Sequence, residues 1–147
     1  RLAAALPHDA VMAVTADHGM IDVPHETRLD LAEHPAHRDL LRAVGGEPRA
    51  AHLYAREGAS ADALAAFRTL VGERGTVLTR AEAVGAGLFG PVRDRNLPRI
   101  GDLVVIGEPG FGIVDSENDS ASALSLLGHH GGVTPDELEI PLLVLNG

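Results

Sequence analysis

The segment that most constrains this chain is an apolar run that ends in a carboxylate and an imidazole. Residues 10–14 are apolar, and Thr15-Ala16-Asp17-His18-Gly19-Met20 follows directly. Neighbouring side chains on a strand point to opposite faces, so Asp17 and His18 can reach one ion only where the chain has already begun to turn. Gly19 is expected to permit that turn through its wide choice of backbone angles. Such a pair at a strand end predicts a metal site in an α/β protein.

A second candidate lies near the other end of the chain. His129 and His130 stand between glycines, and Thr134-Pro135-Asp136-Glu137 follows with a capping-box pattern that predicts a short helical turn. Pro141 ends that turn, and residues 142–145 are predicted to form a last buried strand. If the strands beside both segments share one sheet, the two segments can meet.

Composition limits the chemistry that is available. The 147 residues are 45% hydrophobic, enough for one domain or part of a larger one. All twelve positive charges are Arg and Cys is absent, which excludes a lysine Schiff base, a thiol nucleophile and a thiolate zinc site. His, Asp and Glu remain as metal ligands. The net charge of −9 disfavours a nucleic-acid polymer as partner.

Membrane and targeting signals are not found in the sequence. No apolar stretch approaches the roughly 18–20 residues that span a bilayer, and no signal peptide opens the chain. The localisation stays unknown, with the cytoplasm slightly favoured and no membrane segment expected in this chain.

Hydrophobic patterning predicts alternating strands and helices. Residues 10–15 are expected to form a buried, parallel, central strand, because the run is apolar without alternation. Residues 102–107 and 112–115 are expected to pair as a hairpin. The other predicted strands are 28–31, 49–56 and 76–79, and the predicted helices are 2–6, 36–44 (stopped by Gly45-Gly46), 60–73 (capped by Ser60) and 80–86, with a charged linker at 93–99.

These elements predict an α/β chain with a mixed, mostly parallel sheet and a small inserted α+β subdomain. The core is expected at about residues 1–36 and 100–147, and the inserted block at about 37–99. Residues 1–147 would together form part of one domain.

Four motifs in this order resemble one known family: Thr15–Met20, Gly128–Gly131, Thr134–Glu137 and the apolar strand opened by Pro141. They are similar to the alkaline-phosphatase superfamily, and most closely to its type I phosphodiesterase and nucleotide pyrophosphatase branch. The resemblance covers the whole chain. It implies an alkaline-phosphatase-like sandwich and the hydrolysis of small phosphate esters or nucleotide pyrophosphates.

The resemblance also implies a ligand set. Members of this family use two divalent ions, usually zinc, to clamp the attacking and leaving oxygens of the phosphate. By position, Asp17 and His18 would bind the zinc that activates the hydroxyl nucleophile. His130 would bind the second zinc, while His129 and His25 are possible neighbours that orient or line the site.

The chain departs from the family in what precedes Asp17. Family members carry an upstream half with a further Asp ligand, a Thr or Ser nucleophile and an Asp-x-x-x-His pair, whereas sixteen residues precede Asp17 here. The chain is therefore expected to be the C-terminal part of such a domain, with the N-terminal half as its missing partner. Catalysis by this chain alone is not expected.

Several alternatives remain open at this stage. The complete protein could instead be another enzyme of the superfamily, such as a phosphatase, phosphonate hydrolase or phosphomutase, or a non-catalytic or truncated domain. Asp17 could simply cap a turn, and His130 could be an ordinary loop histidine. Arg49 could contact substrate, although a charge at a strand edge is the simpler interpretation.

Overall fold

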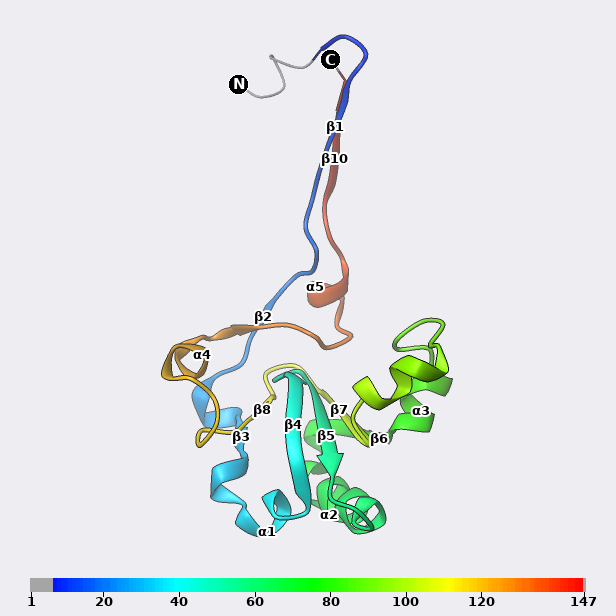
Figure 1. Cartoon of the computed structure of the whole chain (residues 1–147). Coiled ribbons are helices and arrows are strands. Elements are labelled where there is room, and N and C mark those ends of the chain that lie inside the picture. Colours follow the sequence, from blue (N-terminus) through cyan, green and yellow to red (C-terminus); the bar gives the residue numbers. More distant parts are fainter. Residues whose placement is uncertain (1–6, 147) are drawn as a thin grey trace.

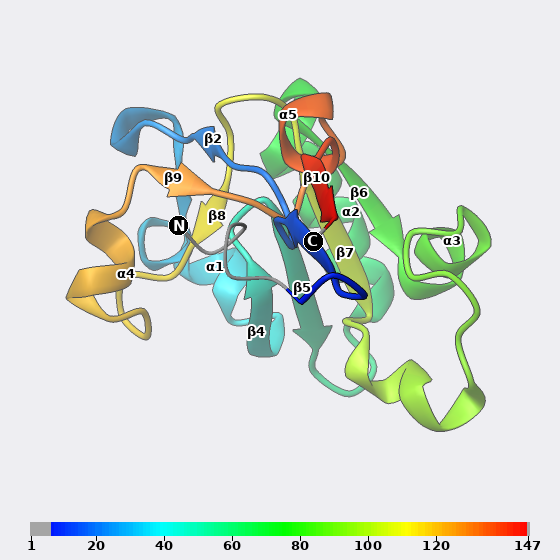
Figure 2. The ribbon, with the colours of Figure 1, turned by 90° about the horizontal axis from the view of Figure 1, so that it is seen from above.

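The computed structural model describes residues 7–146 and shows a compact body from which a two-stranded ribbon projects (Figure 1). The helix predicted at residues 2–6 lies outside the described residues. Viewed along the ribbon, β1 and β10 stand over the middle of the body, with α3 and α4 on opposite sides (Figure 2).

The chain forms short elements joined by well-defined turns. The strands are β1 (Val11–Thr15), β2 (Ile21–Asp22), β3 (Leu29–Asp30), β4 (Leu41–Glu47), β5 (Ala50–Ala55), β6 (Gly75–Thr79), β7 (Leu103–Gly107), β8 (Ile113–Val114), β9 (Gly128–His129) and β10 (Leu142–Asn146). The α-helices are α1 (Pro35–Arg38), α2 (Ser60–Val71), α3 (Arg80–Gly85), α4 (Ala121–Ser125) and α5 (Pro135–Leu138). Short 3-10 turns lie at His25–Thr27, Leu31–Glu33, Gly72–Arg74 and Asp94–Arg99.

The body is built on one four-stranded antiparallel sheet in the order β4-β5-β7-β6. Helix α2 covers one face through Ala63, Phe67 and Val71, which are all buried. Their spacing of four residues places them on one side of the helix. They pack with Leu103 and Val105 of β7 in the main core.

The opposite face of the sheet is covered differently. Because side chains alternate along a strand, Val104 and Ile106 of β7 point away from α2. They pack in a second, smaller core with Ala83 of α3 and with Ile100. This second face is the one that the two histidine-bearing segments approach, so it positions the candidate site.

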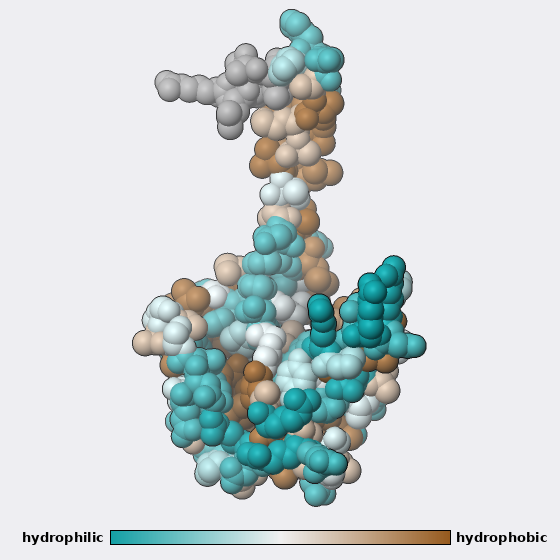
Figure 3. Space-filling model, viewed as in Figure 1, coloured by the Kyte–Doolittle hydropathy of each residue, from teal (hydrophilic) through white to brown (hydrophobic). Residues whose placement is uncertain are grey.

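The predicted strands at both ends of the chain are present, but they are neither parallel nor buried. β1 pairs antiparallel with β10, from Val11 opposite Asn146 to Thr15 opposite Leu142. The side chains of Val11 and Leu142 are 66% and 68% exposed, and apolar residues cover the ribbon in the space-filling view (Figure 3). An apolar run without alternation predicted a strand buried on both faces, but within residues 7–146 no third strand pairs with either edge.

The helix predicted at residues 36–44 is present only at its start, as α1, and its predicted stop at Gly45-Gly46 is wrong. Residues 41–44 form the start of strand β4 rather than the end of a helix, and Gly45 and Gly46 lie within that strand. The tight turn at Pro48-Arg49 returns the chain as β5, and this pairing prevails over local helix propensity. Helix α2 matches its prediction closely, although Ala59 rather than Ser60 is its N-cap.

The predicted hairpin between residues 102–107 and 112–115 is also wrong. β7 already has neighbours on both edges, β5 and β6, so β8 pairs in parallel with β3 instead. The strands at 49–56 and 76–79 and the helix at 80–86 are present with shifts of one or two residues.

The α/β class is confirmed, but the mostly parallel sheet is wrong because the β3–β8 pair is the one parallel ladder within the described residues. The boundaries at 36 and 99 stay a prediction, although the four-stranded sheet also takes in β7 beyond residue 99. None of the helices between residues 7 and 146 is long and apolar enough to cross a membrane.

Candidate functional site

The two segments singled out in the sequence meet in space. The imidazole rings of His18 and His130 stack with their centroids 3.6 Å apart and their planes 16° from parallel. The segments are brought together by the short antiparallel pair of β2 and β9, in which Ile21 lies opposite His129. The expectation that these two loops converge is confirmed. Their role as metal ligands stays a prediction.

A local hydrogen bond orients the imidazole ring of His18. Its Nδ1 lies 2.8 Å from the Gly19 carbonyl oxygen, and because a carbonyl only accepts, Nδ1 carries the proton. In the neutral ring with this tautomer, Nε2 carries the lone pair through which imidazole binds metals. The Asp17 carboxylate lies 3.7 Å from that Nε2 and also accepts the His18 backbone N–H at 3.1 Å.

The group is accessible but not yet a complete metal site. The side chains of Asp17, His18 and His130 are 89%, 34% and 28% exposed, so solvent reaches all three. The Glu47 carboxylate lies 3.9 Å from His130 Nε2. Among residues 7–146 no three His, Cys, Asp or Glu side chains are close enough together to hold an ion.

A buried ion pair lies beneath these loops. Arg49, fully buried in the β4–β5 turn, donates from Nε and Nη2 to the two carboxylate oxygens of Glu137 at 3.0 and 2.8 Å. Its Nη1 donates to the carbonyls of Glu108 and Phe111. Arg49 is therefore neither a substrate contact nor a charge at a strand edge, the two interpretations that the sequence suggested.

The Glu137 carboxylate accepts hydrogen bonds from the loop that follows His130. It accepts the Gly132 N–H at 2.8 Å and the Thr134 hydroxyl at 2.7 Å, which confirms the capping-box pairing of Thr134 with Glu137. Burial acts to raise the pKa of Glu137, but the bonds from Arg49, Thr134 and Gly132 outweigh it and lower the pKa to about 2. The carboxylate is thus ionised at any ordinary pH.

Residue 19 is a glycine because the backbone of α5 lies close to it, not because the turn needs an unusual backbone angle. Its φ angle is not positive, so the predicted need for special backbone freedom is wrong. Instead, a Cβ at this position would lie 1.9 Å from the Asp136 carbonyl oxygen, and the Gly19 N–H donates to the Glu137 carbonyl at 2.9 Å. The Asp17-His18 loop is therefore docked on the backbone of α5.

The docked loops form one side of a cleft of about 300 Å³. Its polar lining includes Asp17, His18 and His130. Its remaining lining is mostly apolar and comes from β5, β7, the loop after α3 and the segment around α5: Ala50, Leu88, Phe89, Val104, Ile106, Gly131, Gly132, Val133, Glu137 and Leu138. A polar wall with an apolar remainder is the usual composition of a small-molecule site.

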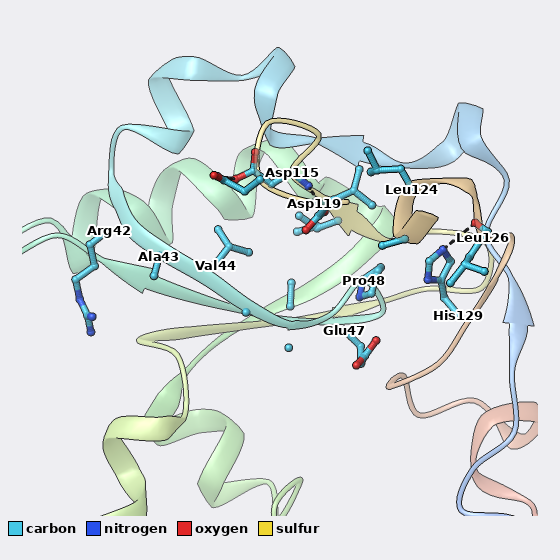
Figure 4. A pocket seen from close by; sticks show the side chains of 17 residues that line it. Arg42, Ala43, Val44, Glu47, Pro48, Asp115, Asp119, Leu124, Leu126 and His129 are labelled. Atoms are coloured by element: carbon cyan, nitrogen blue, oxygen red, sulfur yellow. Dashed lines mark hydrogen bonds between the residues drawn. The ribbon is translucent and has the colours of Figure 1, made fainter. Parts of the chain in front are cut away.

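The other two histidines of the predicted site lie elsewhere. His129 is 6% exposed and lines a separate cavity of about 500 Å³ between β4 and α4 (Figure 4). Its Nε2 donates to the Leu126 carbonyl at 3.2 Å, and burial lowers its pKa, with the nearby Arg28 charge adding to the effect. His25 is exposed in a 3-10 turn and lines neither cavity.

The sequence analysis missed the buried role of Arg49 and the apolar cleft residues Leu88 and Phe89. The role of Arg49 could have been suspected because the capping-box Glu137 needs a cation if it is buried. Leu88 and Phe89 had a local signal as well, since two large apolar residues stand between glycines in an otherwise irregular segment.

Comparisons with known proteins identify the family of this chain. The model of the type I phosphodiesterase / nucleotide pyrophosphatase family matches residues 1–133. The chain belongs to this family. No curated protein matches the sequence.

Several solved structures share the fold. Human ectonucleotide pyrophosphatase / phosphodiesterase 5 matches with a TM-score of 0.67 and 19% identity, over 92% of this chain and 33% of that one. The inactive murine form of that protein in complex with AMP matches with a TM-score of 0.67 and 18% identity, over 92% of this chain and 33% of that one. Phosphonoacetate hydrolase from Sinorhizobium meliloti 1021, in complex with phosphonoacetate, matches with a TM-score of 0.59 and 26% identity, over 92% and 36%. The chain thus spans about a third of these relatives.

The buried carboxylate predicts a specific pH dependence of stability. The pKa of Glu137 is lowered from 4.5 to about 2, so its contribution is present above pH 4.5 and is lost as the pH falls from about 4.5 through about 2. The shift corresponds to about 3 kcal/mol. We expect Glu137→Gln to lower the free energy of unfolding by about 3 kcal/mol at pH 7 and by only about 1 kcal/mol at pH 3, measured by urea unfolding.

Glu139→Gln is the matched control, because Glu139 is exposed two residues further on. It should change stability little at either pH. A loss for Glu137→Gln that is equal at pH 7 and pH 3 would show that the ion pair does not depress this pKa.

The docking of Gly19 predicts a position at which no side chain is tolerated. Because the added Cβ meets backbone rather than a flexible side chain, the loop must move. We expect Gly19→Ala to destabilise the protein by about 1–3 kcal/mol, measured by urea unfolding at pH 7. Gly85→Ala is the control, since nothing lies within 4 Å of a Cβ there, and it should be neutral or slightly stabilising. Equal stability of the two variants would mean that the loop is not held against α5.

Proposed function

We propose that this chain is the C-terminal part of a metal-dependent hydrolase of phosphate esters or nucleotide pyrophosphates. The family match supports this proposal, and the stacking of His18 on His130 is the observation that carries it. Two loops more than a hundred residues apart in sequence present a carboxylate and two imidazoles to one cleft. These are ligand types that zinc prefers when thiolates are absent.

We propose Asp17, His18 and His130 as the ligands that this chain contributes to a site for two zinc ions. When bound, such ions activate a hydroxyl nucleophile and stabilise the leaving oxygen of a phosphate. The chain's own residues orient the site. The Nδ1–H of His18 is held by the Gly19 carbonyl, and Nε2 on the other side of the ring lies 3.7 Å from the Asp17 carboxylate. The Arg49–Glu137 pair holds both loops on the sheet.

The remaining ligands and the nucleophile would come from an N-terminal half. This agrees with the chain covering 33% and 36% of the solved relatives. The exposed apolar ribbon of β1 and β10 offers unpaired strand edges where such a half can add strands. The substrate would be a small phosphate ester or nucleotide.

A phosphonate hydrolase is the second candidate. The phosphonoacetate hydrolase structure has the higher identity of the reported matches, 26%, although its TM-score is lower at 0.59. Both candidates use the same residues of this chain. They are distinguished by whether the full-length protein cleaves a phosphorus–carbon or a phosphorus–oxygen bond.

We expect the full-length protein, loaded with zinc, to hydrolyse bis(p-nitrophenyl) phosphate, and Asp17→Ala or His130→Ala to abolish the release of p-nitrophenolate. Removing one ligand leaves the ion without the charge or lone pair that positions it. His34→Ala is the control, because His34 does not line the cleft. Wild-type turnover by either ligand variant would place the site elsewhere.

We expect the 147-residue chain alone to show no turnover above a zinc-only background. The three proposed ligands are too few for a tight two-ion site, and the nucleophile is expected outside the chain. The measurement is p-nitrophenolate release by the purified chain with zinc, with and without a chelator. A rate well above background that the chelator removes would contradict the proposal that the site is incomplete.

A further inference from the structure

The apolar remainder of the cleft is concentrated in one loop. Leu88 and Phe89 follow α3 and reach the cleft that also contains Asp17 and His130. In Figure 1 this segment rises from the sheet on the side where α5 lies. Leu88 and Phe89 are 37% and 36% exposed. Large apolar side chains left half exposed beside a polar cluster indicate a contact that the chain by itself does not make.

The loop is built to present these two side chains. Gly87 and Gly90 flank them with φ angles of 76° and 59°, and nothing lies within 4 Å of a Cβ at either position. The glycines are therefore required by backbone conformation, not by crowding. The Gly90 N–H donates to the Gly87 carbonyl at 3.0 Å, so Leu88 and Phe89 are the two central residues of a tight turn.

The position of Phe89 is nevertheless fixed by the sheet. Its ring packs edge-on against His52 of β5, with centroids 5.5 Å apart and planes at 83°. His52 Nδ1 in turn accepts the Gly101 N–H at 3.4 Å. An aromatic ring held at one edge, with its remaining surface exposed, is a preorganised contact.

The two walls of the cleft carry different chemistry. Val133 and Leu138 face the cleft from the segment around α5, and Val104 and Ile106 line it from β7. All four are apolar, whereas the polar lining side chains are Asp17, His18 and His130 of the two docked loops and the buried Glu137 of α5. A ligand with a charged phosphoryl group and an apolar substituent would therefore match both parts at once.

We propose that Leu88 and Phe89 form the specificity wall of this site, and that they bind the organic substituent of an aryl phosphate ester or phosphonate. This inference rests on the proposed function, because it requires the phosphoryl group to lie at Asp17, His18 and His130. The cleft of about 300 Å³ is at the lower end of small-molecule sites, which suits one aromatic ring beside the phosphoryl group. Phe89 is a specificity residue here and takes no part in bond cleavage.

The test compares two ligands that differ only in the substituent. Phenylphosphonate and methylphosphonate carry the same phosphonate group, so both test binding at Asp17, His18 and His130. Only the phenyl ring is large enough to contact Leu88 and Phe89. Their dissociation constants are measured by calorimetry on the zinc-loaded full-length protein. We expect Phe89→Ala to weaken phenylphosphonate binding about tenfold and to leave methylphosphonate binding unchanged, since a lost apolar contact typically changes discrimination by that order.

Two further variants make the result specific. Phe89→Leu keeps apolar volume at the wall and should retain most of the preference for phenylphosphonate. Leu127→Ala removes a side chain that is 49% exposed and lines neither cavity, and it should bind both ligands as the wild type does. Thermal unfolding of each variant shows that it is folded.

The outcomes separate this inference from the proposed function. If Phe89→Ala weakens both phosphonates equally, or neither, Phe89 is not a specificity wall and the inference is overturned. Equal dissociation constants of the wild type for the two phosphonates would also overturn the inference. A wild type that prefers phenylphosphonate but hydrolyses no phosphodiester would instead overturn the proposed reaction and leave the wall in place.

Discussion

The buried ion pair of Arg49 with Glu137 is the constraint on which the arrangement of the site depends. Burying two charges is costly unless each is fully bonded, and here the guanidinium meets both carboxylate oxygens and two backbone carbonyls. The Glu137 carboxylate also accepts the Gly132 N–H, and the Glu137 backbone carbonyl accepts the Gly19 N–H. One interaction therefore joins the sheet to both histidine-bearing loops, which explains how His18 and His130 come to stack.

This constraint also explains residues that look dispensable in the sequence. A Cβ at Gly132 would lie 2.5 Å from a Glu137 oxygen and 2.6 Å from an Arg49 nitrogen, and one at Gly107 would lie 2.8 Å from another Arg49 nitrogen. The glycines give the guanidinium room to reach its partners without strain. Two of the glycines around the His130 segment and β7 are thus set by packing against the ion pair rather than by turn geometry.

Local patterns in the sequence predicted the elements whose partners are close in the chain. The 49–56 strand, helix α2 and the capping box at Thr134 all follow from short-range spacing, and each is present. The wrong predictions concern segments whose structure depends on pairing with another strand. Residues 41–44 become a strand because β5 returns beside them, and residues 112–115 leave the predicted hairpin because β7 is paired on both edges. The burial of β1 and β10 was predicted wrongly because an apolar sequence favours burial but does not identify the segment that packs against it.

The same reasoning separates the predictable part of the site from the rest. The convergence of His18 with His130 could be anticipated, because both follow strands and ligand sites gather at strand ends. His129 is the last residue of β9 and lines the β4–α4 cavity, whereas His130, the residue after that strand, lines the cleft. The contacts of Arg49 and Phe89 could not be predicted, since Arg49 meets Glu137 far along the chain and Phe89 meets His52 of a strand that precedes α3. The chemistry of the polar wall was therefore encoded in motifs, whereas the apolar wall that selects among ligands is encoded in tertiary packing.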